Sequence, residues 1–335
     1  MKRKLTLAIL LLSNLWIYAQ EADDYREAAN QGDAEAQFNL GLCYHSGDGV
    51  TQDYEQAVVW YTKAANQGYK MAQFNLGVCY EVGEGVAQDY EQAIYWYNQA
   101  ANQGDLKSQY NLGLCYYNGI GVTKDYEQAI SWFTKAANQC HAKSQFMLGV
   151  CYYNGEGVRQ DAKKAVSWFT KAANQGQADA QYNLGMCYES GEGVKQDIKQ
   201  AVAWFTRAAN QGHAEAQGNL GVCYEIGYGV TQDYKQAIYW YTEAANQGNA
   251  KAQFSLGLCC QAGKGVKQDY KQAMVWFTDA ANQGLAEAQF VLGACYYYGE
   301  GVAQNRKQAV YWLTKAANQG STDAQELLNE LGEHK

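Results

Sequence analysis

Small and apolar residues recur with the period of a helix from Asp33 onward. Those of the first segment are Ala36, Leu40, Cys43 and Tyr44. Residues separated by four, seven and eight positions lie on one face of an α-helix. Gly47 follows, and glycine commonly ends a helix because it adopts a positive φ without strain. The pattern predicts a first helix that ends at Gly47.

A second helix is expected after a short loop. Asp53 precedes it, and an aspartate in this position accepts hydrogen bonds from the first backbone N–H groups of a helix. Gln56, three residues later, can bond back to the cap. The small and apolar residues that follow are Ala57, Trp60, Tyr61, Ala64 and Ala65. Gly68 ends the segment, so the two helices form an antiparallel hairpin joined by a loop of ordinary length.

This hairpin pattern repeats every 36 residues. Cysteine marks it at Cys43, Cys79, Cys115, Cys151, Cys187, Cys223, Cys259 and Cys295, and tryptophan at Trp60, Trp96, Trp132, Trp168, Trp204, Trp240, Trp276 and Trp312. A fixed period of this length is typical of a solenoid, in which each unit buries its apolar face against its neighbours. The sequence therefore predicts an all-α fold: an α/α solenoid, wound as a right-handed superhelix, of eight 36-residue helix–turn–helix repeats with capping half-repeats.

The two ends of the chain depart from the repeat. Residues 1–19 combine a basic start, an apolar run and a small residue before Gln20, which predicts a secretory signal peptide cleaved after Ala19. An uncleaved anchor is the alternative. The remaining parts are expected to be an N-terminal capping helix at 20–32, the repeats at 33–320, and a C-terminal capping helix and tail at 321–335. The mature protein is then exported, periplasmic or secreted, without stable membrane insertion.

The chain is acidic, and this limits its partners. Its formal net charge is −8, from 26 basic and 34 acidic residues, and removal of the three basic residues of the signal peptide makes it −11. An acidic surface disfavours nucleic acids and anionic membranes. We expect neither as a partner.

The repeated motif includes Ala36, Leu40, Gly41, Tyr44, Gly47, Gly49, Val50, Asp53, Ala57, Trp60, Ala64, Ala65 and Gly68. It resembles the Sel-like repeat (SLR) family of the tetratricopeptide-like superfamily, over about residues 20–332. The resemblance implies an α/α superhelix that serves as a scaffold for protein–protein contacts. Some exported, cysteine-rich members of the family look stapled by a disulfide within each repeat, which uses two cysteines per repeat. This chain has one cysteine per repeat, so the resemblance does not imply those disulfides here.

The ten cysteines allow two interpretations. In an exported chain they suggest disulfides. However, equivalent positions on neighbouring helices lie roughly 8–10 Å apart, and a disulfide needs Cα atoms closer than about 7 Å. We therefore predict buried, unreactive thiols. Cys140, which replaces a repeat glycine, and Cys260, beside Cys259, are the exceptions, of which either could be partly exposed and redox-active.

Motifs for catalysis or for a cofactor are missing from the sequence. The cysteine spacing is not that of a zinc site, and the histidines His45, His141, His213 and His334 are scattered. The repeated GxG loops are interpreted as helix ends and tight turns rather than phosphate cradles. No SxxK with KTG, HExxH or GxSxG occurs. We predict no metal, no cofactor and no enzymatic activity; a β-lactamase-like, cell-wall-related hydrolase is an alternative by family analogy only.

The resemblance places the first helix of each unit along a concave groove that binds a protein or an extended peptide. The candidate binding residues are Asn39, Asn75, Asn111, Asn183, Asn219, Tyr117, Tyr153 and Tyr297. Amides one repeat apart could clamp a peptide backbone, and the tyrosines occupy a position that varies between units and suits an interface anchor. Two alternatives stay open: these side chains only satisfy neighbouring groups, or the protein is a structural spacer.

Overall fold

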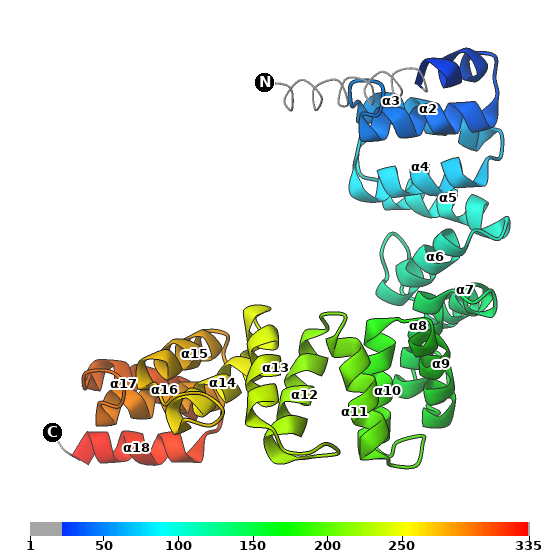
Figure 1. Ribbon diagram of the computed structural model, residues 1–335. Helices are drawn as coiled ribbons and strands as arrows, with labels where there is room; N and C mark the ends of the chain where they lie inside the picture. The colour runs from blue at the N-terminus through cyan, green and yellow to red at the C-terminus, as the bar shows by residue number, and fades with distance from the viewer. Residues whose placement is uncertain (1–21, 334–335) are drawn as a thin grey trace, which may run out of the picture. The chain divides into compact units, whose positions relative to one another are not determined.

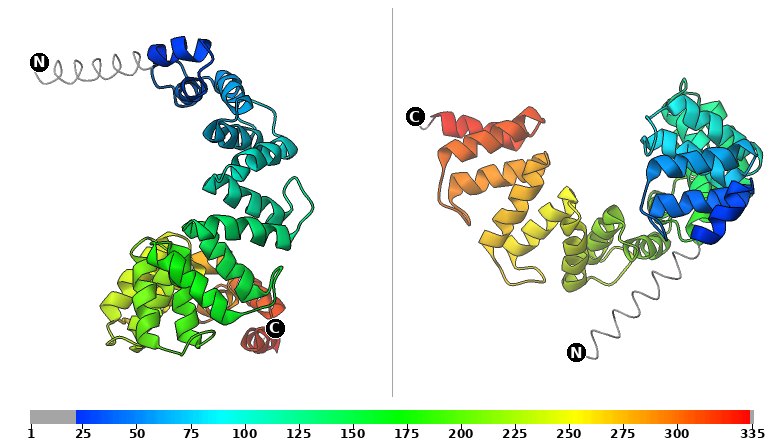
Figure 2. Two further views of the ribbon diagram at one scale, coloured as in Figure 1. Left: turned by 90° about the vertical axis from the view of Figure 1, so that its right-hand side faces the viewer. Right: turned by 90° about the horizontal axis from the view of Figure 1, so that it is seen from above.

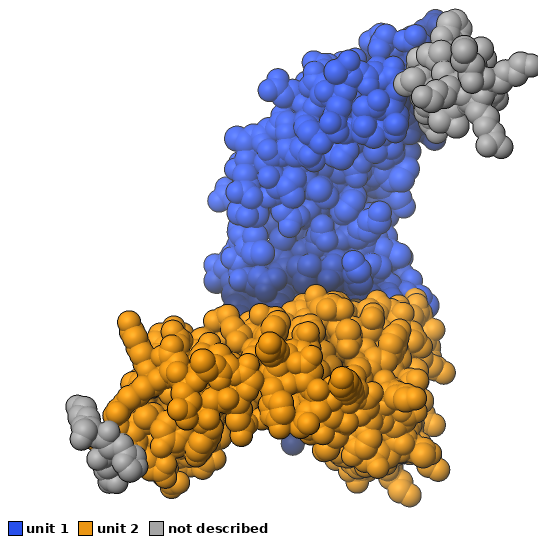
Figure 3. Space-filling view, turned by 60° about the vertical axis from the view of Figure 1, so that its left-hand side comes forward, with its two compact units in different colours: residues 1–161 blue, residues 162–335 orange. Residues whose placement is uncertain are grey.

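The computed structural model describes residues 22–333. These residues form helices and loops without any strand (Figure 1). The chain is divided into two compact units (Figure 3). The first unit, residues 1–161, contains a helical segment at 22–30 followed by α2 (Ala34–Ser46), α3 (Tyr54–Asn66), α4 (Lys70–Val82), α5 (Tyr90–Asn102), α6 (Leu106–Asn118), α7 (Tyr126–Asn138) and α8 (Ala142–Asn154). The second, residues 162–335, contains α9 (Ala162–Asn174), α10 (Ala178–Ser190), α11 (Ile198–Ala209), α12 (Ala214–Ile226), α13 (Tyr234–Asn246), α14 (Ala250–Ala262), α15 (Tyr270–Asn282), α16 (Ala286–Tyr298), α17 (Arg306–Asn318) and α18 (Thr322–Glu333).

Within each unit the helices stack in the order of the chain (Figure 2). In the first unit α2 packs against α3, and α3 packs in turn against α4 of the next repeat. The second unit has the same arrangement from α10 to α17. The predicted all-α fold of stacked helix pairs, about 36 residues each, is confirmed.

The predicted helix ends are found in the structure. Asp53 caps α3, and its side chain accepts a 3.0 Å hydrogen bond from the backbone N–H of Gln56. Gly47 ends α2 with φ at 80°, and its N–H donates to the carbonyl of Cys43 at 2.8 Å. Such capping satisfies backbone groups that a helix leaves unpaired at its ends.

The core lies between repeats as much as within them. Tyr61 and Ala64 of α3 pack with Leu76 and Cys79 of α4, and Trp96 of α5 closes the same cluster. Leu76 is fully buried, and Tyr61 is 1 % exposed. Small alanines beside large rings allow the helices to approach closely. A single hairpin would leave much of this apolar surface in water, so each repeat depends on its neighbours.

The second glycine of each GxG loop contacts the preceding repeat. Gly85, in the loop between α4 and α5, has φ at 70° and lies against the start of α3. A Cβ atom on Gly85 would stand 2.1 Å from the carbonyl oxygen of Tyr54. The loop is therefore a helix end and a tight turn, as predicted, and also a packing surface between repeats, which was not predicted.

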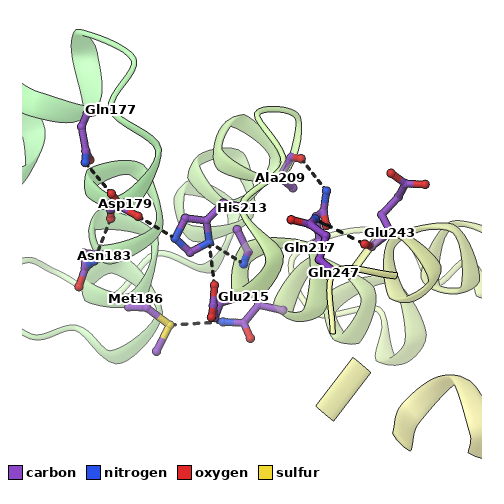
Figure 4. Close-up of polar contacts among 12 residues, drawn as sticks. Gln177, Asp179, Asn183, Met186, Ala209, His213, Glu215, Gln217, Glu243 and Gln247 are labelled. Atoms are coloured by element: carbon purple, nitrogen blue, oxygen red, sulfur yellow. Dashed lines mark hydrogen bonds and ion pairs between the residues drawn. The ribbon is translucent and has the colours of Figure 1, made fainter. Parts of the chain in front are cut away.

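A buried glutamine links successive repeats through hydrogen bonds. On α12, Gln217 donates from Nε2 to the carbonyl of Ala209 at 3.1 Å and accepts from Gln247 Nε2 at 2.7 Å (Figure 4). Ala209 lies one helix before Gln217, and Gln247 follows α13. The buried glutamines at this position include Gln37, Gln73, Gln109, Gln181, Gln217, Gln253 and Gln289. Their role was not predicted from the sequence, yet they replace water for a row of buried polar groups.

The ends of the chain are described only in part. The predicted signal peptide, residues 1–19, lies outside the described residues. At the other end, Leu327 and Leu331 of α18 are buried against Leu313 of α17. The capping roles of the helix at 22–30 and of α18 stay predictions, as do the proposed domain limits.

Candidate functional site: the face of the first helices

The first helices of the repeats carry two rows of apolar side chains, and each helix contributes one residue to each row. The first, the aromatic row, comprises Phe38, Phe74, Tyr110, Phe146, Tyr182, Phe254 and Phe290, with Gly218 at the equivalent place in α12. Its rings pack against buried rings of the second helices, as Phe38 does on Tyr61, with centroids 5.9 Å apart. Most rings of the row are only half-buried, so their other side remains accessible.

The second row is aliphatic and more exposed. It comprises Leu42, Val78, Leu114, Val150, Met186, Val222, Leu258 and Ala294, four residues after the aromatic row. Leu42, Val222 and Leu258 are each about 40 % exposed. Residues four apart lie on the same side of a helix, so in each unit the two rows form one face, which we call the first-helix face.

The first-helix face is hollowed in both units. In the first unit, a depression of about 740 Å³ is lined by Phe38, Leu42, Met71, Phe74 and Asn75, among others. In the second unit, one of about 490 Å³ lies beside Phe254, Phe290 and Val291. A smaller depression lies beside Gly218. Depressions with apolar walls and a few polar groups suit ligand binding.

The candidate asparagines are half-buried on this face, and several are used inside the protein. Asn75 faces the hydroxyl of Tyr61, and Asn111 faces that of Tyr97. Asn183 donates to the carbonyl of Asp179 at 2.8 Å, and Asn219 donates to the sulfur of Met186 at 3.4 Å (Figure 4). These contacts favour neighbouring groups as the first partners of the amides. The clamp on a peptide backbone stays a prediction.

The candidate tyrosines are also half-buried. Tyr117 donates to a carboxylate oxygen of Glu156 at 2.6 Å and packs edge-on against Tyr126. Tyr297 packs against Tyr298, whose side chain is 59 % exposed. Tyr153 lies at the equivalent position of α8. Their role in binding a partner stays a prediction.

The residue type at the position of Tyr117 varies together with that of the residue 39 places later, which lies in the loop of the next repeat. Three of the pairs within one unit form hydrogen bonds: His45 with Glu84, Tyr117 with Glu156, and Gln261 with Glu300. In the other three, the acid stands first: Glu81 with Ile120, Glu189 with Tyr228, and Glu225 with Lys264. No pair contains two acids, which would repel each other. Contacts between repeats thus explain part of the variation that led us to predict an interface anchor at this position.

Comparison with known proteins identifies the family. The family model described as the Sel1 repeat matches residues 34–69, 70–105, 106–139, 142–177, 178–213, 214–249, 250–285 and 286–321. The chain belongs to the Sel1 repeat family. Among solved structures it is similar to c5321 from uropathogenic Escherichia coli, described as a protective antigen with an SLR fold. That match has 38 % identity and a TM-score of 0.86, and it covers 92 % of this chain and 67 % of the other.

A second similar structure is a Sel1 repeat protein from Oxalobacter formigenes, with 35 % identity and a TM-score of 0.72. It covers 95 % of this chain and 94 % of the other. No curated protein matches the sequence. Sel1 repeat proteins are generally helical scaffolds for protein interaction, and the comparisons give no support to the cell-wall hydrolase alternative.

Residues 22–333 of this Sel1 repeat protein lack both a metal-binding cluster and a helix able to span a membrane. That part of the chain holds no group of three or more His, Cys, Asp or Glu residues placed to bind a metal ion. Nor does it contain a helix with the length and hydropathy needed to cross a bilayer.

The cysteines of the Sel1 repeats are buried, whereas Cys140 is exposed. Burial raises the pKa of the Cys79 thiol to about 11 and that of Cys151 to about 12. Cys140 has φ at 63° where other repeats hold glycine. The expected exposure is confirmed for Cys140. It is wrong for Cys260, which is only 6 % exposed. Cys260 occupies the position that a half-buried tyrosine holds in the other repeats, and its side chain is smaller than that of tyrosine.

A thiol reagent added to the native protein at pH 8 is therefore expected to modify one cysteine rapidly. Thiolates react and thiols do not, and the buried groups are both protonated and covered. Mass spectrometry of the Cys140→Ser variant should show the fast modification lost, and unfolding in guanidinium without reductant should release ten reactive thiols in the parent chain. Two or more fast thiols, or fewer than ten after unfolding, would contradict this description.

The half-buried carboxylate of Glu189 lacks a partner that its equivalents have. Tyr97 donates from its hydroxyl to Glu81, and Tyr241 does so to Glu225 at 2.7 Å. Phe205 stands at the same place relative to Glu189 and has no hydroxyl. Burial raises the pKa of Glu189, so the ionised side chain destabilises the folded state, and stability falls as the pH rises through that pKa.

The Phe205→Tyr variant is expected to be more stable than the parent protein at pH 7, by about 1 kcal/mol, the usual value of one hydrogen bond. The new hydroxyl would donate to Glu189 and so weaken the pH dependence described above. Urea unfolding at pH 5 and pH 7 measures both effects. Tyr241→Phe, in the same unit, is the reciprocal control and should lose a similar amount; equal stability of all three proteins would refute the assignment.

Proposed function

We propose that this Sel1 repeat protein is an exported, non-catalytic scaffold that binds a protein or an extended peptide through its first-helix face. The observation that supports this proposal is the pair of apolar rows on the first helices, which remain half-buried or exposed after the repeats have packed. Monomeric proteins rarely leave continuous apolar surface uncovered without a function. Export is proposed from the sequence of residues 1–19 alone.

The chemistry of the face favours an extended ligand. The same apolar contact is offered at successive first helices, and polar groups such as Asn39 and Asn75 lie beside it. A ligand in extended conformation can place alternate side chains on such a repeated surface while its backbone pairs with polar groups. The candidate asparagines and tyrosines are proposed to line this surface.

A displayed library of random 12-residue peptides, selected on the immobilised full chain, tests the proposal. Leu258 on α14 belongs to the first-helix face and is 38 % exposed, whereas Val275 on α15 lies on a second helix and is 51 % exposed. We expect selected peptides to bind the Val275→Lys variant like the parent and to lose binding to Leu258→Lys. Failure to select any peptide, or loss of binding only in Val275→Lys, would refute the proposed function.

A further inference from the structure

The aromatic row is interrupted at one place, Gly218 on α12. Seven of the eight repeats carry phenylalanine or tyrosine there. Glycine is among the least favourable residues for the interior of a helix, and nothing in the local backbone requires it, because Gly218 does not have a positive φ. A Cβ atom on Gly218 would have a single neighbour within 4 Å, Asn249 Oδ1 at 3.8 Å, which is an ordinary contact distance.

The missing ring leaves a pocket. It has a volume of about 140 Å³ and is lined by Tyr182, Val222, Asn219, Tyr241 and Ser255 together with Gly218. In five other repeats, the ring of the aromatic row lies 5.8–6.0 Å from the ring of the second helix. The equivalent second-helix ring here is Tyr241, which is 1 % exposed and forms the floor. A cavity of roughly 150 Å³ accommodates a benzene ring.

The rim of the pocket is acidic on one side. Glu215 lines the pocket, and its side chain is 61 % exposed. His213 lies between Glu215 and Asp179, with a nitrogen 3.4 Å from a carboxylate oxygen of each (Figure 4). Its ring also stacks on that of Tyr182, with centroids 4.7 Å apart. The opposite rim holds Lys251. A cation beside the entering ring would therefore meet the exposed carboxylate of Glu215 at the rim, with that of Asp179 on the other side of His213.

We propose that the Gly218 pocket is the anchor subsite of the first-helix face and takes a phenylalanine side chain of an extended peptide that carries a basic residue next to it. The peptide's ring occupies the place that the chain's own ring fills in seven repeats, and its basic residue contacts Glu215 and Asp179. Aromatic side chains that fill such pockets often dominate the energy of an interface. This inference rests on the proposed function and adds the identity of the anchor.

Gly218→Phe is the decisive variant, because it restores the ring of the other repeats and closes the pocket from within. Peptides from the displayed library are synthesised with a fluorescent label, and their Kd for the full chain is measured by anisotropy. We expect the selected peptides to share one aromatic residue beside a lysine or arginine. Gly218→Phe should weaken binding about 30-fold, as should alanine in place of the peptide's aromatic residue. Glu215→Gln should weaken it a few-fold at low salt and less at high salt.

Thermal unfolding and light scattering accompany each titration. Gly218→Leu fills the same space and replaces Gly218→Phe if the latter does not fold. Peptides that bind Gly218→Phe or Gly218→Leu as tightly as the parent, yet lose binding to Leu258→Lys, would overturn the anchor and leave the proposed function standing. Formation of dimers that the Gly218 variants abolish would show that a second copy of the chain fills the pocket, and would overturn the peptide assignment.

Discussion

Replacement of Gly85 by alanine is expected to lower the free energy of unfolding of the first unit by about 3–4 kcal/mol. The positive φ of Gly85 accounts for about 1 kcal/mol of this loss, because a Cβ atom strains that conformation. Overlap with the Tyr54 carbonyl, 2.1 Å from the new atom, accounts for about 2–3 kcal/mol. Neither atom can rotate away, since the carbonyl oxygen belongs to the backbone and the backbone fixes the position of the Cβ. The loop must therefore move off α3, and two repeats lose part of their contact.

Gly68→Ala is the matched control in the same unit. Gly68 also has a positive φ, at 86°, but nothing lies within 4 Å of its added Cβ. We expect a loss of about 1 kcal/mol from the backbone strain alone. Urea unfolding, followed by circular dichroism, compares the two variants. Equal losses would show that the contact between the Gly85 loop and the preceding repeat does not stabilise the stack.

Two glycines of α12 are expected to respond to the same substitution in opposite directions. In Gly221→Ala, the new Cβ would lie 2.5 Å from the ring of Tyr241, which is buried and cannot move aside. We expect a loss of about 2–3 kcal/mol, because overpacking in a close-packed core forces the two helices of the hairpin apart. The glycine of each Leu-Gly pair is thus required by the approach of the second helix.

Gly218→Ala lies one turn away on the same helix and supplies the control. Its new methyl group fits without overlap, with Asn249 Oδ1 at 3.8 Å as its one neighbour within 4 Å, so the higher helix propensity of alanine should stabilise the second unit by about 1 kcal/mol. Thermal and urea unfolding of the two variants give the comparison. A destabilised Gly218→Ala would show that the pocket beside Gly218 is not open, and would remove the basis of the anchor subsite.

The hairpins were predictable because their determinants are local. The spacing of Leu40 and Cys43, the cap at Asp53 and the glycine at Gly47 act within one helix or at its end. Each pattern occurs eight times, so chance variation in one repeat does not hide it. The predicted fold and the family resemblance agree with the structure and with the comparisons for this reason.

Contacts between repeats could not be predicted from this local spacing of residues. Gly85 meets Tyr54, and Gln217 is bonded to Gln247, across separations of about 30 residues that no local periodicity reports. The pairing of Tyr117 with Glu156 could have been found by comparing each repeat with the next at a spacing of 39 residues. This pairing does not decide whether Tyr117 also binds a partner, which is left to experiment.

The break at Gly218 was readable in the sequence, but its consequence was not. A missing ring can be filled by neighbouring side chains, and only the positions of Asn249, Val222 and Tyr241 show that a space remains. The burial of Cys260 was misjudged for a related reason. Cys260 stands at a position that is tyrosine in the other repeats, and the packing around that position buries it. Its neighbour in the sequence, Cys259, gives no sign of this packing.

Photo-crosslinking tests the binding role of the first-helix face most directly. A library-selected peptide is synthesised with p-benzoylphenylalanine in place of its aromatic residue, irradiated with the full chain, and the linked residues are identified by mass spectrometry. Links are expected on α12 and α14, beside Gly218, Val222 and Ser255, and should disappear in Gly218→Phe. Links confined to second helices such as α13 and α15, or links unchanged by that substitution, would contradict the placement of the ligand on this face.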